Sequence, residues 1–142
     1  MASEAHQWLL LWIVRKMVAD GFLLSNCDGS LPQGGCWKGL PQPPEIDGFR
    51  ADARGVLPET GELGLGEAKT SHDIDTPHTR QQLRVFGNLK GSDGKSVCRL
   101  YVAVPRSDVT VLDRVLRDVG LLGAPNIVRL HIPDCFVTGE VR

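Results

Sequence analysis

The stretch IDGFRADARGVLPETGELGLGEAKT, residues 46–70, decides the fold of this chain. At its centre, the residues PETG at 58–61 suit a type I turn, because such turns favour proline early and glycine at the last position. The segments on either side have the residue types of strands and span 46–57 and 62–70. The sequence therefore predicts an antiparallel hairpin in which Leu57 faces Glu62.

The same register, continued along the hairpin, places Asp52 opposite Glu67. Opposed residues on neighbouring strands share a face and have Cβ atoms about 5 Å apart, which would let the two carboxylates share one divalent cation. Lys69 projects from that face as well, because alternate residues of a strand lie on the same side. Two acids and a lysine around a metal ion suit the hydrolysis of a phosphodiester.

The opposite face of the second strand carries only small side chains, at Gly64, Gly66 and Ala68. Small side chains let a helix approach a strand closely. This pattern predicts a central strand that is covered by a helix on that face.

Several basic residues lie near the proposed face and would contact phosphates although the whole chain is nearly neutral. Those expected to bind nucleic acid are Arg50, Arg54, Arg80 and Arg84. The register also sets Arg50 opposite Lys69, a like-charge pair that is unfavourable unless bound phosphate screens it. A bulge near Arg54 and Gly55 would instead shift the register.

The remaining elements alternate between helices and strands. Apolar residues at helical spacing predict helices, and apolar runs that end at proline predict buried strands. Helices are expected at 3–20, 76–88 and 107–120, and strands at 96–104 and 126–132. This order predicts an α/β protein with a mixed central β-sheet flanked by helices. The 142 residues have the length of one domain, 1–142.

Residues 23–45 are rich in glycine and proline, which interrupt any regular period. The segment is therefore expected to be a long insertion loop. Loops of this length are usually functional or disordered. Trp37 and Lys38 could contact a ligand, or Trp37 could fold back onto the core.

Charge and composition exclude several classes of protein. The net charge of -1 excludes the strong positive field of a non-specific nucleic-acid coat. No apolar run is long enough to span a membrane, and the first residues lack the basic segment of a secretory signal. We therefore expect a cytoplasmic protein with free, buried thiols. No CxxC pair is formed by the cysteines, which are Cys27, Cys36, Cys98 and Cys135.

The order of the acids and the lysine resembles that of the PD-(D/E)XK nuclease superfamily. This is the fold of many restriction endonucleases, Holliday junction resolvases and phage-type exonucleases. The resemblance begins with Glu4, an acid early in the first helix, and continues with Asp52 on one strand and Glu67-Ala68-Lys69 on the next.

The helix that follows extends the resemblance. In that family it often carries a glutamine near the active site, and Gln82 followed by Phe86 is similar to the Gln-xxx-Tyr variant. Gln81 is the competing choice. The chain departs from the family pattern in having no proline before Asp52 and in having Phe86 in place of the tyrosine.

The resemblance implies a restriction endonuclease-like core of αβββαβ order and Mg²⁺- or Mn²⁺-dependent hydrolysis of DNA. It assigns catalysis to Asp52, Glu67, Lys69 and Gln82, and metal binding to Glu4, Asp52 and Glu67. Glu4 has a second explanation, because the helix dipole favours an acid in the first turn. Lys69 would orient or deprotonate the attacking water, or offset the charge that develops on the phosphate.

A function of another class remains as the alternative. A non-catalytic nucleic-acid-binding or assembly domain of the same fold would carry the acids by chance and would use the 23–45 loop to contact a partner. In either case the expected partner is DNA and not a membrane. A homodimer is also expected, because enzymes of this type that cut two strands often pair their subunits.

Overall fold

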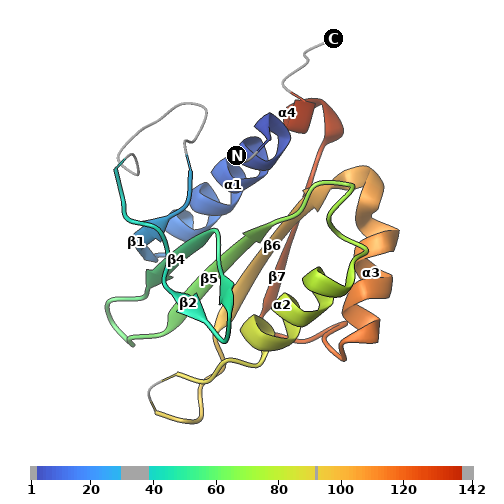
Figure 1. Cartoon of the computed structure of the whole chain (residues 1–142). Helices are drawn as coiled ribbons and strands as arrows, with labels where there is room; N and C mark the ends of the chain where they lie inside the picture. Colours follow the sequence, from blue (N-terminus) through green and yellow to red (C-terminus); the bar gives the residue numbers. More distant parts are fainter. Residues whose placement is uncertain (1–2, 30–38, 92, 139–142) are drawn as a thin grey trace.

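A five-stranded mixed sheet lies at the centre of the computed structural model, which describes residues 3–29, 39–91 and 93–138 (Figure 1). The strands, in their order across the sheet, are β1 (Leu23–Cys27), β4 (Ala53–Val56), β5 (Leu63–Ala68), β6 (Arg99–Pro105) and β7 (Ile127–Ile132). The first three strands pair antiparallel, and β5, β6 and β7 pair parallel. The predicted α/β class and mixed sheet are confirmed.

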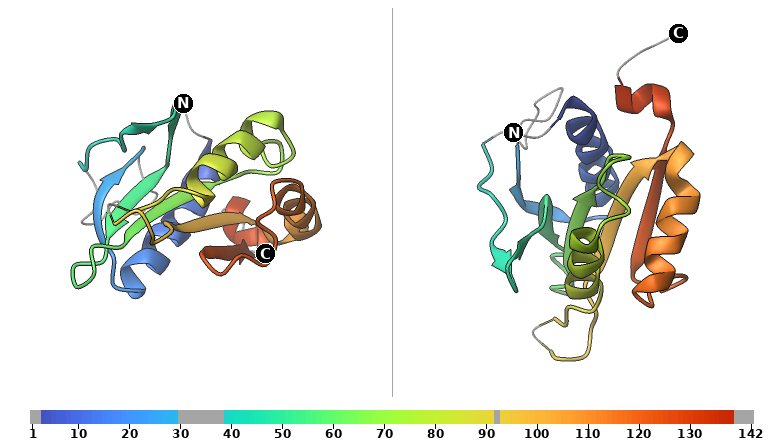
Figure 2. Two further views of the ribbon diagram at one scale, coloured as in Figure 1. Left: turned by 90° about the horizontal axis from the view of Figure 1, so that it is seen from below. Right: turned by 45° about the vertical axis from the view of Figure 1, so that its right-hand side comes forward.

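Helices pack against both faces of this sheet, as Figures 1 and 2 show. They are α1 (Glu4–Ala19), α2 (Pro77–Gly87), α3 (Val109–Asp118) and the short α4 (Asp134–Thr138), with a 3-10 turn, η1 (Arg106–Asp108), before α3. The first two begin where the sequence predicts, because the side chains of Ser3 and Thr76 cap them. α1 lies over one face, and α2 and α3 lie over the other.

The predicted hairpin register is confirmed between β4 and β5. Val56 pairs with Leu63, Ala53 pairs with Gly66, and the Leu57 N–H donates to the Glu62 carbonyl at 2.9 Å. A register shift does occur beside residues 54–55, but it lies in β1, and the pairing of β4 with β5 stays regular.

The hairpin is shorter than predicted on its first side. The ladder between β4 and β5 ends where Ala53 pairs with Gly66, and the Asp52 N–H also donates to the Gly66 carbonyl, at 2.9 Å. The chain before Asp52 leaves the sheet, and Arg50 pairs with Glu45 in a separate two-stranded sheet of β2 (Glu45–Ile46) and β3 (Phe49–Arg50). The predicted opposition of Arg50 to Lys69 is therefore wrong.

The predicted 23–45 loop needs a second correction. Its first residues form β1, which pairs with β4 at one edge of the sheet, and its last residue begins β2. Hydrogen bonds to a neighbouring strand outweigh the weak local pattern of this segment. Trp37 and Lys38 lie outside the described residues.

Two other expectations concern the thiols and the membrane. Cys27 and Cys98 are free and buried, as predicted, but Cys135 is free and exposed, and Cys36 lies outside the described residues.

Within the described ranges, none of the helices combines the length and the apolar character that crossing a membrane requires.

The small residues of β5 allow α1 to pack directly on the strand, as predicted. A Cβ atom added to Gly66 would lie 2.5 Å from Ile13 Cγ2, and one added to Gly64 would lie 2.5 Å from a ring carbon of Phe22. Real side chains do not approach so closely. The absence of a side chain at Gly66 therefore lets α1 lie this close to the sheet, and the absence at Gly64 makes room for Phe22, which follows the helix.

We expect Gly66→Ala to lower the free energy of unfolding by about 1–3 kcal/mol, because the added methyl group overpacks the contact with Ile13. Urea denaturation measures this change. Gly91→Ala is the control, since a Cβ atom there meets its nearest neighbour at 3.5 Å. Equal free energies of unfolding for the two variants would contradict the close packing of α1 on β5.

Candidate active site

Four of the residues predicted to be catalytic meet at the carboxyl end of β5. Glu67 lies on β5, Lys69 follows the strand, Asp52 precedes β4, and Gln82 faces them from α2. Glu67, Lys69 and Gln82 are 2%, 8% and 6% exposed. Polar side chains are rarely buried to this extent without a specific role, so the cluster is the first candidate for a functional site.

Asp52 is bound to the end of β5 through both its main chain and its side chain. Its N–H donates to Gly66, and its Oδ2 accepts a hydrogen bond from the Ala68 N–H at 2.8 Å. The hydrogen bond to the Ala68 N–H holds the Asp52 carboxylate near Glu67. The predicted reason was different, namely that Asp52 and Glu67 would be directly opposed on neighbouring strands. The two acids predicted to share a metal ion thus lie together.

Glu67 has one paired and one unpaired carboxylate oxygen. Oε2 lies 3.5 Å from Lys69 Nζ, whereas Oε1 is buried and has no hydrogen-bond partner in the part of the chain that the structure describes. Burial raises the pKa of Glu67 well above its ordinary value, and the nearby charge of Asp52 raises it further. Lys69 and, more weakly, the main chain of Asp52 oppose both effects. A buried, unsatisfied polar atom costs about 1–3 kcal/mol, so this oxygen is a costly feature of the site.

Lys69 is held between two side chains. Its ammonium group donates a hydrogen bond to Gln82 Oε1 and lies beside Glu67. Gln81 is exposed on the same helix, so the structure places Gln82, and not Gln81, at the lysine. Phe86 is buried in the core beneath α2.

Glu4, the third predicted metal ligand, is exposed on the first turn of α1. In the ranges that the structure describes, no set of three or more His, Cys, Asp or Glu side chains is gathered as for a metal ion. The structure therefore brings together Asp52 and Glu67, and the described residues place no further carboxylate with them as a metal ligand.

His6 reaches the site where the sequence led us to expect Glu4. Its Nε2 lies 3.2 Å from Asp52 Oδ2, and this hydrogen bond raises the pKa of His6, although burial lowers it. The signal was present in the sequence, because His6 lies three, four and seven residues before Leu9, Leu10 and Ile13 on the buried stripe of α1. Glu4 is not on that stripe.

Asp28 is a second neighbour that the sequence did not reveal. Its N–H donates to the Asp52 carbonyl at 2.8 Å, and its Oδ1 accepts a hydrogen bond from Gln42. Gln42 also accepts a hydrogen bond from Arg50, which is exposed on β3. Asp28 was missed because it follows β1, which the sequence analysis had assigned to a loop.

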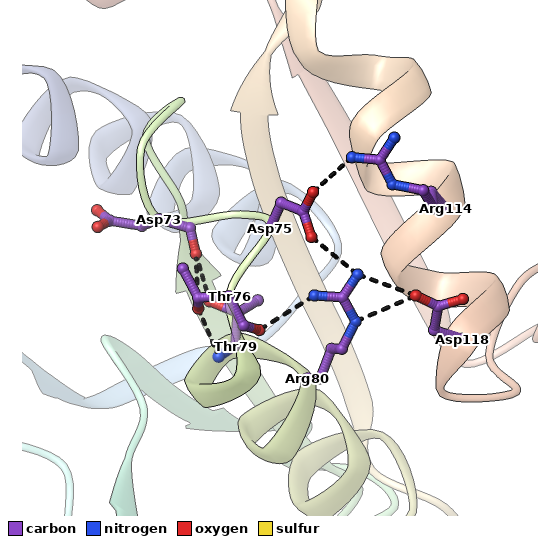
Figure 3. A network of polar contacts seen from close by, with 7 residues as sticks. All are labelled: Asp73, Asp75, Thr76, Thr79, Arg80, Arg114 and Asp118. Carbon is purple, nitrogen blue, oxygen red and sulfur yellow. Dashed lines mark hydrogen bonds and ion pairs between the residues drawn. The ribbon is translucent and has the colours of Figure 1, made fainter.

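Arg80 belongs to a network of charges that joins α2 to α3 (Figure 3). Its guanidinium lies 2.8 Å from Asp75 and 2.9 Å from Asp118, and Asp75 also pairs with Arg114. The two positive charges of the arginines and the two negative charges of the aspartates cancel in this network. The structure therefore gives Arg80 a role in holding α2, whereas its predicted contact with nucleic acid stays a prediction.

The other predicted phosphate-binding residues have different surroundings. Arg84 is exposed on α2. Arg54 is half-buried on β4 and pairs with Leu65, which places it on the face of the sheet that carries Glu67. Their contact with nucleic acid also stays a prediction.

We expect Asp52→Asn to lower the pKa of His6, because burial then acts without the opposing carboxylate. NMR titration of the imidazole measures this. Since the folded pKa lies above the ordinary 6.5, the pair stabilises the fold below about pH 6.5 and loses that contribution as the pH rises through the folded pKa. Asp47→Asn, at an exposed turn, is the control. An unchanged His6 titration in Asp52→Asn would show that the two side chains do not interact.

Comparison with known proteins adds no family to this geometry. Neither protein-family models, nor curated protein sequences, nor solved structures give a match to the chain. What the site can do must therefore be argued from its own residues.

Proposed function

We propose that the protein is a metal-dependent nuclease that hydrolyses DNA phosphodiester bonds on a restriction endonuclease-like core. One observation carries the proposal: a buried carboxylate oxygen, Glu67 Oε1, has no hydrogen-bond partner among the described residues and lies in a cluster with Asp52 and Lys69. Two acids close together are unfavourable unless a positive charge compensates them. Lys69 compensates only one oxygen of Glu67.

The pair of carboxylates suits a hard divalent cation. Mg²⁺ prefers oxygen ligands and is usually bound by only one or two carboxylates, with water and substrate phosphate at its other positions. Asp52 and Glu67 would therefore hold Mg²⁺ or Mn²⁺ without a third acid. A bound ion would polarise the phosphate and lower the pKa of a water molecule.

Lys69 and Gln82 would supply the remaining polar chemistry. Hydrolysis forms a bond from a water oxygen to phosphorus and breaks one phosphorus–oxygen ester bond, and negative charge develops on the phosphate oxygens. The Lys69 ammonium would offset that charge, or its amine would orient or deprotonate the water. Gln82 fixes the position of Nζ by accepting a hydrogen bond from it.

The arrangement of the elements supports the same proposal. A capped helix precedes an antiparallel hairpin, and the second hairpin strand connects through α2 to the parallel strand β6. The acids and the lysine lie where that strand ends, beside the helix that carries Gln82. This order of elements and residues supports the proposed restriction endonuclease-like core.

We expect Lys69→Met to lower the rate of DNA cleavage in Mg²⁺ by about 10²-fold or more while divalent-metal binding is kept, because Lys69 is not a metal ligand. Linear, nicked and branched DNA should all be tested, since the preferred substrate is a separate question. Lys95→Met, which removes an exposed lysine from the turn before β6, is the matched control.

The outcomes separate the two candidate functions. Equal cleavage rates for wild type and Lys69→Met would refute the role of Lys69. Binding of DNA without cleavage of any substrate, in Mg²⁺ or Mn²⁺, would favour the non-catalytic nucleic-acid-binding or assembly domain.

A further inference from the structure

A groove lies on the Glu67 face of the sheet, toward the amino end of β5. It has a volume of about 380 Å³, and its lining includes Ile46, Arg54, Val56, Leu63, Leu89 and Lys90. The main chain of two glycines, Gly61 and Gly91, completes the lining. The groove is therefore bounded by β2, β4, the start of β5 and the segment that follows α2.

The charge of this groove is positive and uncompensated. The described residues of its lining include two cations, Arg54 and Lys90, and no acid. Among the residues that the structure describes, neither cation takes part in an ion pair. Glu62, the residue before β5, is paired with Arg99. Glu62 and Asp93 line a neighbouring pocket that shares Gly61, Leu63 and Gly91 with the groove, and the two positive charges lie in the groove itself. An anion in the groove would therefore meet these two charges first.

The position of the groove relates it to the candidate active site. Arg54 pairs with Leu65, which lies two residues before Glu67 on the same face of β5. Two steps along a strand, from Leu65 to Glu67, span about 7 Å, and the four steps from Leu63 to Glu67 span about 13 Å. Since the phosphates of one DNA strand recur at about 3.4 Å along the helix axis, this distance corresponds to a few nucleotides.

We propose that this groove binds the sugar–phosphate backbone of a DNA strand a few nucleotides from the phosphate that is cleaved. Arg54 and Lys90 contact successive phosphates, and the aliphatic side chains, such as Leu63 and Leu89, contact deoxyribose. None of the described residues that line the groove is aromatic. The proposed contact is therefore made to the backbone and not to stacked bases, and it is independent of sequence. This inference rests on the proposed function, and it identifies one path of the substrate across the protein.

The test is the binding of a short, fluorescently labelled DNA duplex, followed by anisotropy in EDTA so that no cleavage can occur. The variant is Arg54→Gln/Lys90→Gln. Loss of two phosphate contacts is expected to weaken binding about tenfold or more at low salt. It should also reduce the slope of log K against log salt by about two units.

The control carries the same change in net charge on the other side of the sheet. Arg15 and Lys16 are exposed on α1, so Arg15→Gln/Lys16→Gln tests whether net charge alone explains the effect. The control variant should keep the wild-type salt slope. Thermal unfolding of both variants establishes that each is folded.

The outcomes for the groove and for the proposed nuclease are distinct. If the salt slope falls in the groove variant and not in the control variant, DNA binding in the groove is supported. This holds even where Mg²⁺ produces no cleavage and the nuclease proposal fails. If the groove variant and wild type have equal salt slopes, DNA does not bind in the groove, even where wild type cleaves DNA. Loss of inorganic phosphate binding in the groove variant with unchanged DNA binding also overturns DNA binding in the groove, because the ligand is then a free anion.

Discussion

The buried carboxylate of Glu67 is the constraint on which the candidate active site depends. A charge that is removed from water must be neutralised or paired, and Glu67 is only 2% exposed. Lys69 pairs with one of its oxygens, the other has no hydrogen-bond partner within the described ranges, and Asp52 adds a second negative charge nearby. A proton or a cation resolves this conflict, and a divalent ion does so for both acids at once.

The sheet holds that carboxylate where three other elements converge. β5 is the middle strand, and the glycines on its far face let α1 pack directly on it. Because α1 is so close, its first turn brings His6 to Asp52. α2 covers the opposite face, presents Gln82 to Lys69, and is tied to α3 through Arg80. The close packing on one face and the polar cluster on the other are therefore parts of one arrangement.

Local chemistry made part of this structure predictable. The turn at 58–61 and the alternation of its flanks specify the register of β4 and β5, which is why the neighbourhood of Asp52 and Glu67 could be inferred. The regular register of β4 and β5 ends before Asp52. The Asp52 side chain accepts a hydrogen bond from the Ala68 N–H, a contact that no local sequence pattern encodes. The family pattern predicts an acid at the site from the first helix, and it therefore favoured Glu4. The buried stripe of α1 instead includes His6.

The central claim is that Asp52 and Glu67 together bind a divalent cation. Its most direct test is NMR of the isotope-labelled protein during titration with Mn²⁺, which broadens the amide signals nearest to the ion. Broadening should begin at Asp52 and Ala68, persist in Glu59→Gln at the exposed turn, and be lost in Glu67→Gln. Equal broadening in Glu67→Gln and wild type would contradict the claim, as would broadening centred on acids away from β5.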